Sequence, residues 1–375
     1  MKTDAQKLII KTITCHDVYN FGASLQAYAL MRYLIELGHE VEIINYKPPY
    51  LTFNLWAIGA KWKKNPLLRI LYFLYVVPKK LSLRKRRKKF DKFTQNKLIL
   101  TKKTYKSAAE LQQSPPVADV FFAGSDQIWN HLVPNGKDSS FFLKFADSKS
   151  KKASYAASFS VEDIPNELEN HYKEMLSNID FISVRESTGL KLLKNLGISE
   201  AQVVVDPVFL LDHDDWGKLT YEYSKEKYIF VYDQENNKKI RDAAKNISKR
   251  YNLKIFAIES LYPMSYAHKR IKDADPIDFV SLISNAEVVL TNSFHCIAFS
   301  IIFNKKFWLF KRTHMAVNSR MVDLLKCLAL SDRIVDDHIE RLNNDEIDYS
   351  KVLSKLQPLI SSSYNFIDSV LKDGK

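Results

Sequence analysis

A histidine that follows a short apolar run is the residue of this sequence best placed to do chemistry. The stretch 287–303 reads EVVLTNSFHCIAFSIIF, in which a polar turn at Asn292 and Ser293 separates two apolar runs, the second beginning at Phe294. This is the pattern of a buried parallel strand that ends at a helix start. His295 then lies in the first helical turn, where N–H groups and the helix dipole favour anions. An imidazole there can hold a phosphate or give it a proton; the alternative is that Ser293 only caps a helix and His295 is structural.

Two other apolar runs, at 8–14 and 119–123, end in loops that carry a carboxylate together with small or amide side chains. In open α/β sheets such loops lie at the carboxyl edge, where ligands bind. The alternative is that Asp126 is a turn residue and that Asp17 only stabilises its loop together with His16. The candidates in these two loops are Asp17, Asn20, Gly22, Ser125, Asp126 and Gln127.

Arg185 follows the apolar run 181–184 and precedes a helical pattern. A guanidinium at the end of a buried strand can make a two-point contact with a carboxylate or a phosphate. It can also form an internal ion pair with Glu186 or an ion pair between domains. The position therefore indicates either a ligand clamp or a structural charge pair.

The order of apolar and amphipathic runs predicts an α/β protein with two doubly wound, Rossmann-like domains that face each other across a cleft. We expect an N-terminal domain over 1–210 and a C-terminal domain over 211–345. The final amphipathic run, within 346–375, is long enough to pack back on the first domain. Residues 51–110 contain an aromatic and basic stretch and are expected to be an insertion in the first domain.

Local signals predict the bounds of single elements. Ser24 stands where a helix cap belongs, before an amphipathic run that stops at Gly38. The small residues of 152–159 indicate one continuous strand, and 228–232 followed by 238–251 indicates a strand and a helix of the second domain.

Composition limits the class of protein. With 375 residues, 46% of them hydrophobic, the chain can fill two cores. Its three cysteines are widely spaced and, like the histidines, show no metal-ligand spacing, so we expect a reducing compartment and no metal. The first residues lack the apolar run of a signal peptide, which places the protein in the cytoplasm.

The positive charge is concentrated in one segment. The net charge is +13, and residues 79–89 (KKLSLRKRRKK) hold eight Lys or Arg and no acid. The apolar stretch 67–77 just before them is too short to span a bilayer. Residues 67–89 therefore suit either a position on an anionic membrane surface or a solvated insertion. No nucleic-acid-binding motif accompanies the charge, so we expect no nucleic-acid partner.

Six stretches in order resemble the bacterial polysaccharide pyruvyl transferase family. They cover most of the chain apart from 51–110 and the tail, and each falls at a predicted strand-to-loop edge. The stretches are TCHDVYNFGASLQAYAL at 14–30, FAGSDQIWN at 122–130, SYAASF at 154–159, ISVRES at 182–187, VVDPVFLL at 204–211 and TNSFHCIAFSIIF at 291–303.

The resemblance implies a fold similar to GT-B glycosyltransferases and no cofactor. Phosphoenolpyruvate would be the co-substrate, and its pyruvyl group would form a cyclic ketal with two hydroxyls of a hexose in a surface glycan or its lipid-linked precursor. His295 matches the family's histidine and would be the acid, and Arg185 matches its donor-binding arginine. The helix start from Asn292 to Phe294 would hold phosphate. Asp126 or Asp17 would accept a sugar hydroxyl proton, and the other loop residues would face the acceptor.

The sequence departs from the family at the histidine motif. Some relatives carry Arg-Leu where this chain has Ser293 and Phe294. A phosphate-binding cation is therefore missing, and Arg312, His314 or Arg320 would have to supply it. Relatives also often have glycine at the position of Ser160.

Two other functions fit the same architecture. One is a GT-B-type glycosyltransferase that uses a nucleotide sugar, because fold analogy alone does not separate the two reactions. The other is a non-catalytic glycan-binding member of a biosynthetic complex, which the missing motif arginine would allow.

Overall fold

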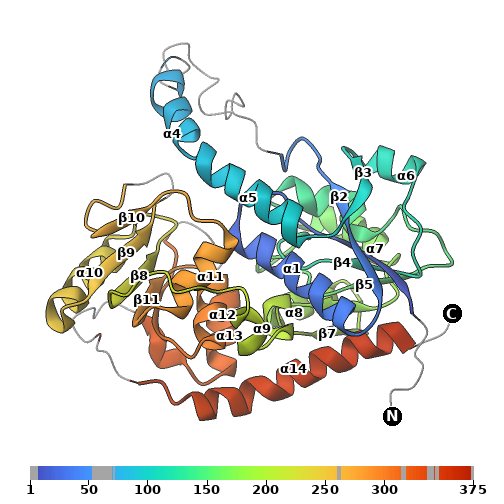
Figure 1. Cartoon of the computed structure of the whole chain (residues 1–375). Coiled ribbons are helices and arrows are strands. Elements are labelled where there is room, and N and C mark those ends of the chain that lie inside the picture. Colours follow the sequence, from blue (N-terminus) through green and yellow to red (C-terminus); the bar gives the residue numbers. More distant parts are fainter. Residues whose placement is uncertain are drawn as a thin grey trace.

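The computed structural model describes residues 7–52, 70, 72–259, 263–313, 318–335, 342 and 346–372. These residues form two lobes, each built on a parallel sheet flanked by helices (Figure 1). We call residues 7–210 the first lobe and residues 211–335 the second lobe. The two sheets confirm the predicted α/β class with two Rossmann-like domains.

The first sheet has the strand order β3-β2-β1-β4-β5, and all of its paired strands are parallel. The chain moves outward from β1 in one direction and returns to β4 on the other side, so the switch point lies between β1 and β4. A short parallel pair, β6 and β7, continues this sheet through single bridges from Ala153 and Ala157. The strands are β1 Ile9–Ile13, β2 Glu40–Tyr46, β3 Leu100–Tyr105, β4 Val120–Ala123, β5 Lys151–Ser154, β6 Ile182–Val184 and β7 Ala201–Val203.

The second sheet has the order β10-β9-β8-β11-β12-β13 and is also parallel, with its switch point between β8 and β11. Its inner strands are apolar throughout because helices cover both faces, as parallel sheets require. The strands are β8 Tyr228–Tyr232, β9 Lys254–Ile258, β10 Lys269–Ile271, β11 Val288–Thr291, β12 Lys306–Phe310 and β13 Ile334–Val335.

The helices connect the strands in the order expected of doubly wound domains. In the first lobe they are α1 Phe21–Glu36, α4 Val77–Ser82, α5 Arg84–Lys97, α6 Ala108–Gln113, α7 Asn166–Leu176 and α8 Ser187–Asn195. In the second lobe they are α9 His213–Gly217, α10 Lys238–Tyr251, α11 Pro276–Ser284, α12 Phe294–Ile302 and α13 Ser319–Cys327.

Three local predictions need correction. The cap of helix α1 lies four residues before the predicted one: Asn20 Oδ1 accepts from the Ala23 N–H at 3.3 Å, and Ser24 is buried inside the helix. The strand expected over 152–159 stops at Ser154, because Ala156 takes a positive φ of 50° that ends an extended strand. The expected insertion 51–110 contains β3, which pairs with β2 as part of the first sheet.

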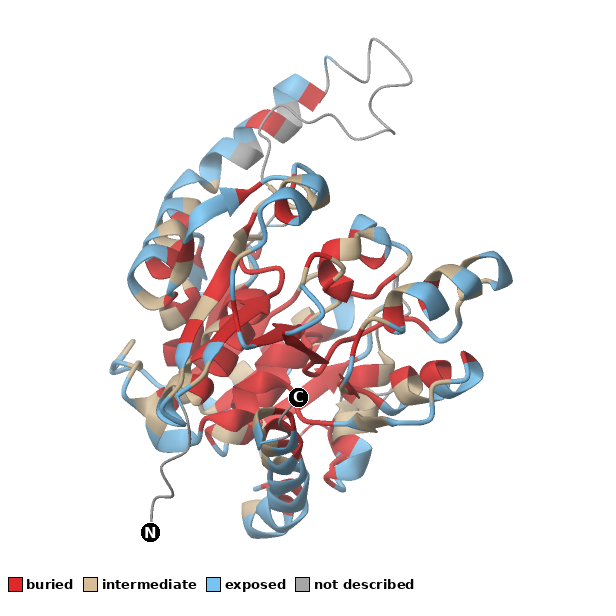
Figure 2. Cartoon of the chain, turned by 90° about the vertical axis from the view of Figure 1, so that its right-hand side faces the viewer, coloured by how far each residue is buried: buried red, intermediate tan, exposed pale blue. Residues whose placement is uncertain are grey.

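The two lobes share a hydrophobic core. Phe21, in the first turn of α1, stacks on Phe279 of α11 with ring centroids 4.5 Å apart and meets Tyr232 of β8 at 5.6 Å. One cluster of buried apolar side chains runs through both lobes, and Figure 2 shows the buried residues gathered in the interior with exposed residues on the outer helices and loops. The first turn of α1 is therefore held directly against the second lobe.

The last helix, α14 (Tyr349–Lys372), runs below both lobes in Figure 1. It packs against the first lobe: Ser363 Oγ accepts from the Val205 N–H at 2.9 Å, and Tyr364 stacks on Tyr33 at 4.9 Å. None of the helices in the described part of the chain is both long and apolar enough to cross a membrane.

Candidate functional site

A cavity of about 140 Å³ lies where the switch points of the two sheets face each other. Its walls come from the loops after β1, β4, β8, β11 and β12 and from α13, so both lobes contribute. Ligands bind at such crevices outside the carboxyl ends of parallel strands. The lining residues are Asn20, Asp126, Gln127, Gln234, Asn292, Ser293, Phe294, His295, Arg312, Arg320 and Met321.

Most of the residues selected from the sequence therefore meet in one place. His295 lies in the first turn of α12, as the apolar pattern around it predicts, and is 8% exposed. Its Nε2 lies 3.4 Å from Asp206 Oδ2 of the first lobe. Its Nδ1 faces Gly22, at the start of α1. The imidazole is thus held between the two lobes at the edge of the cavity.

Asp206 is the functional candidate that sequence reasoning missed. It is 1% exposed, and its Oδ2 accepts a 2.7 Å hydrogen bond from Arg185 Nη1 while it faces His295. Burial by itself would raise the pKa of this carboxyl, but His295 and Arg185 hold that pKa well below its ordinary value. The available signal was the Asp206-Pro207 pair directly after an apolar run, within the stretch VVDPVFLL that resembles the family.

Arg185 occupies a different place from the one predicted. Its side chain is 1% exposed, it does not line the His295 cavity, and its closest charged partner is Asp206 rather than the adjacent Glu186, which lies 3.8 Å away. Arg185 and His295 do face a common anion, but that anion is the Asp206 carboxylate. The contacts therefore agree with the ion-pair alternative, in the form of a pair that Asp206 makes with both residues.

The Phe294 ring is in contact with both Arg185 and Arg320. The Arg185 guanidinium carbon lies 4.9 Å from the ring centroid and that of Arg320 lies 5.8 Å from it. Burial, and then the Arg185 charge, lower the pKa of Arg320 to about 10. Within the described part of the chain, Arg320 Nε has no hydrogen-bond partner. A buried cation in this setting favours the binding of an anion.

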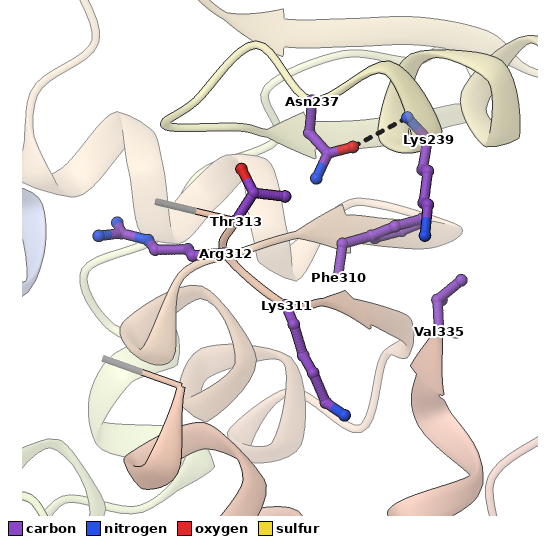
Figure 3. Close-up of a pocket in the computed structure, with 7 residues that line it drawn as sticks. All are labelled: Asn237, Lys239, Phe310, Lys311, Arg312, Thr313 and Val335. Atoms are coloured by element: carbon purple, nitrogen blue, oxygen red, sulfur yellow. Dashed lines mark hydrogen bonds between the residues drawn. The ribbon is translucent and has the colours of Figure 1, made fainter. Parts of the chain in front are cut away.

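Arg312 brings a second cation to the same cavity. It follows β12, and its Nε donates to the Asn292 carbonyl at 3.2 Å. Arg312 also lines a second pocket together with Lys311 and Val335, and Figure 3 shows its side chain extending away from these two residues. Two of the three residues proposed to replace the missing motif arginine, Arg312 and Arg320, thus reach the cavity, and His314 lies outside the described residues.

The start of α12 has fewer free donors than expected. The Ser293 N–H donates to Thr291 Oγ1 at 3.1 Å, and the Ser293 side chain makes no capping hydrogen bond. Asn292, which follows β11, is bonded to the loop after β8. Its Nδ2 donates to Asp233 Oδ1 at 2.8 Å, and its Oδ1 accepts from the Gln234 N–H at 3.0 Å. The first-turn N–H groups that follow, beginning at Phe294, have no partner within the helix.

The loops of the first lobe divide into two groups. Asn20, Asp126 and Gln127 line the cavity, and the Asp126 carboxylate lies 3.9 Å from Arg185 Nη2. Asp17 does not line it and instead pairs with Lys47 at 3.0 Å. Ser125 is fully buried, and its hydroxyl donates to the Ala156 carbonyl at 2.8 Å. Of the two carboxylates considered as a base, only Asp126 faces the cavity.

The close approach of His295 accounts for the absence of a side chain at Gly22. A Cβ built on Gly22 would lie 1.9 Å from His295 Nδ1, which is far inside contact distance. We expect Gly22→Ala to displace the imidazole from Asp206 and to lower turnover by about 100-fold, because misplacing a reacting group by about 1 Å has that effect. Steady-state kinetics measures this, and circular dichroism checks the fold.

Gly217→Ala is the matched control for this substitution. Gly217 ends α9, and nothing lies within 4 Å of a Cβ built there, so its turnover should match that of the wild type. Equal activity of Gly22→Ala and Gly217→Ala would contradict the importance of the close approach.

The sequence matches the model of one family, described as polysaccharide pyruvyl transferase, over residues 20–314. The match includes the cavity residues from Asn20 to Arg312, while residues 14–19 of the loop after β1 and Arg320 lie outside it. No curated protein matches the sequence.

Solved structures share the general arrangement of the chain at low identity. A putative UDP-N-acetylglucosamine 2-epimerase from Listeria monocytogenes is 9% identical, with 98% of this chain and 91% of that chain covered and a TM-score of 0.48. UDP-GlcNAc 2-epimerase from Neisseria meningitidis is 10% identical, with 97% and 94% covered and a TM-score of 0.47. A glycosyltransferase from Rickettsia africae is 13% identical, with 98% and 100% covered and a TM-score of 0.47.

Proposed function

The chain belongs to the polysaccharide pyruvyl transferase family, and we propose that it moves a pyruvyl group from phosphoenolpyruvate onto two hydroxyls of a hexose. The product is a cyclic ketal on a cell-surface polysaccharide or on its lipid-linked precursor. The observation that carries this proposal is the cavity itself, in which an imidazole, two guanidinium groups and a carboxylate from both lobes converge. These groups match an anionic donor that must gain a proton and lose phosphate.

The reaction needs two protons delivered, one to carbon and one to the departing phosphate, and two removed from the sugar hydroxyls. A proton added to the methylene carbon of phosphoenolpyruvate makes a methyl group and leaves a cationic carbon beside the carboxylate. One sugar hydroxyl adds to this carbon and loses its proton. The bond to phosphate then breaks, and the second hydroxyl adds and loses its proton in turn. One of the two hydroxyl protons balances the methyl group and the other leaves with the phosphate.

His295 is the acid in this scheme. An imidazole changes charge near neutral pH and can both give and receive a proton. Asp206 faces Nε2 and holds the ring in position, as a buried carboxylate does in other acid–base pairs. Asp206 does not line the cavity, so it acts as a positioning residue.

Asp126 is the base in this scheme. It is the carboxylate that the first lobe contributes to the wall, next to the amides of Asn20 and Gln127. A carboxylate at this position can accept the hydroxyl proton of a sugar held against the first lobe. The second lobe, which carries the cations, then holds the donor.

Arg320 takes the role of the arginine that is absent at position 293. It lies in the cavity wall, it is buried, and it shares the Phe294 ring with Arg185. A phosphate or carboxylate of the donor would satisfy its Nε and offset the repulsion from Arg185. Arg312 reaches the same anion from the end of β12.

We expect Arg320→Gln to lower kcat/KM for phosphoenolpyruvate by about 10- to 100-fold, the range of one charged hydrogen bond. The free energy of unfolding should change by less than about 1 kcal/mol, because losing the contact with Phe294 is offset by losing the repulsion from Arg185. Kinetics at varied donor concentration and urea unfolding measure the two quantities.

Arg333→Gln serves as the control. Arg333 is also buried and lies over the ring of Trp308, but it is not part of the cavity wall. The assignment of Arg320 fails if both variants keep the wild-type kcat/KM, or if they lose it equally.

The experiment that tests the function is phosphate release from phosphoenolpyruvate in the presence of a hexose-containing acceptor. Mass spectrometry of the acceptor should show an added pyruvyl group with loss of water. A glycosyltransferase would instead consume a nucleotide sugar and release a nucleotide, and a binding protein would release neither. Either of those results would replace the proposal.

The acceptor and the location belong to the same proposal. A lipid-linked precursor is built at the inner face of the cell membrane, so the enzyme would work in the cytoplasm at that face. The three free cysteines of the chain, Cys15, Cys296 and Cys327, fit a reducing compartment.

A further inference from the structure

A helical arm projects from the first lobe. It consists of residue 70, the turn Tyr72–Val76 and helices α4 and α5, and Figure 1 shows it rising away from both sheets. Its outer part carries exposed apolar side chains: Ile70, Leu74 and Leu81 are 57%, 63% and 46% exposed. Exposed apolar side chains grouped at one end of a projecting element mark an interaction site.

A row of basic residues continues from this tip along α5. Arg84, Lys88 and Lys92 are spaced four residues apart, so they share one face of the helix, and all three are exposed. The opposite face carries Phe90 and Phe93, which are buried against the first lobe. The arm thus presents an apolar end followed by a positive stripe.

The base of the arm contacts both lobes. Phe90 meets Phe21 of α1 with ring centroids 5.2 Å apart, and Arg86 lies over the Phe21 ring at 4.5 Å. Lys89 pairs with Asp278 of α11 at 3.2 Å and with Asp273 at 3.5 Å, both in the second lobe. The orientation of the arm is therefore tied to the orientation of the cavity, because Phe21 adjoins Gly22 and the His295 contact.

We propose that this arm docks the protein on an anionic phospholipid surface. The apolar tip inserts among the lipid headgroups, and the basic row lies along the negative surface, as in interfacial helices with one apolar and one basic region. Contact with lipid itself does not depend on the proposed reaction. The further step, in which this contact brings the cavity to a lipid-linked acceptor, rests on the proposed function.

The charge pattern selects this occupant. A second copy of this chain would bring the same basic row against itself, and like charges facing each other at an interface are unfavourable. An anionic bilayer offers negative charge beside the apolar region that the tip needs. Residues 67–69 and 71 of the segment predicted to lie on a membrane fall outside the described residues, so the surface is defined by the side chains named above.

The test is co-sedimentation of the full chain with two kinds of vesicle: phosphatidylcholine alone, and equal parts of phosphatidylcholine and phosphatidylglycerol. We expect binding to the mixed vesicles that weakens as salt is added. Each basic side chain near such a surface contributes about fivefold to binding. Reversing the row with R84E/K88E/K92E should therefore reduce the partition coefficient by roughly 100-fold or more.

The matched control reverses the same number of charges elsewhere. Lys238, Lys245 and Lys249 are exposed on α10, far from the arm in Figure 1. The partition coefficient of K238E/K245E/K249E on the mixed vesicles should stay within a few-fold of the wild-type value. Equal losses in the two triple variants would mean that only net charge matters, and this would overturn the proposal.

A second variant tests the tip without changing charge. I70S/L74S should weaken binding to the mixed vesicles, because two exposed apolar side chains can no longer insert. If the wild type is a dimer that this change converts to monomers while vesicle binding stays intact, a second copy covers the tip and the proposal is wrong. Absence of any preference of the wild type for anionic vesicles would also overturn it.

Activity on a soluble acceptor separates the two proposals. All of the arm substitutions are at exposed positions outside the cavity, so phosphate release with a soluble acceptor should stay at the wild-type rate. Lipid binding without phosphate release would contradict the reaction and leave the arm's role intact. Phosphate release without lipid binding would support the reaction and contradict the role of the arm.

Discussion

Replacing His295 with alanine should lower kcat at least about 100-fold, and up to about 10,000-fold, while the protein stays folded. This is the range for the loss of a general acid or base. The imidazole is the cavity group that can carry a proton to the donor at neutral pH, and Asp206 and the start of α1 hold it between the lobes. The measurement is the steady-state rate of phosphate release from phosphoenolpyruvate with acceptor present.

His213→Ala is the control for loss of an imidazole. His213 lies on α9 and is exposed, pairing with Asp214 at the surface. This variant should keep the wild-type kcat. Full activity of the His295→Ala variant would remove His295 from the chemistry and would leave Asp126 and the arginines as a binding site without an acid.

Replacing Asp206 with asparagine should lower the free energy of unfolding by about 3–5 kcal/mol, the usual effect of removing one partner of a buried charge pair. Asp206 is 1% exposed and lies between His295 and Arg185, so the neutral amide leaves Arg185 without its closest anion. Turnover should fall as well, because His295 loses the carboxylate that positions it.

The effect of this substitution should depend on pH in a defined direction. The pKa of Asp206 is lower in the folded protein than in the unfolded chain, so the unfolded chain takes up its proton first as the pH falls. The stabilising contribution is complete above about pH 4, the ordinary value of an Asp side chain. The difference in stability between wild type and Asp206→Asn should therefore be largest at neutral pH and should narrow below about pH 4.

Urea unfolding at several pH values measures both quantities. Asp368→Asn is the control, because the Asp368 side chain is 44% exposed on α14 and its pair with Lys372 should contribute less than about 1 kcal/mol. If Asp206→Asn loses no more stability than this control, the buried network does not stabilise the interface. If the loss is large but independent of pH below 4, the charge of Asp206 is not its cause.

The sequence by itself determined the class of fold and the position of most of the site. Local pattern alone predicts β8 and α10 with the bounds that the structure has, because a continuous apolar run and a 3.6-residue repeat are local properties of the chain. The same reasoning places His295 at a helix start after a buried strand, and places Asp126 after β4. Since parallel strands present their carboxyl ends on one edge, these residues share an edge without any knowledge of contacts.

Smaller local errors had local causes. Asn20 rather than Ser24 caps α1, because both residues can accept from a helix N–H and the pattern does not distinguish them. The positive φ of Ala156 has no signature in the run of small residues that contains it. In the expected insertion, β3 is an edge strand with a largely polar sequence, so no apolar run marked it.

Only the tertiary structure decided which charges meet. Asp206 is 89 positions from His295 and 21 from Arg185 in the chain, yet its carboxylate faces both. Arg320 becomes a cavity residue because α13 packs it beside Phe294, and Asp17 leaves the site because Lys47 is within reach. Periodicity reports which face of an element is buried, whereas an ion pair depends on how distant elements are brought together. That arrangement follows from packing of the whole core, and no short stretch of sequence contains it.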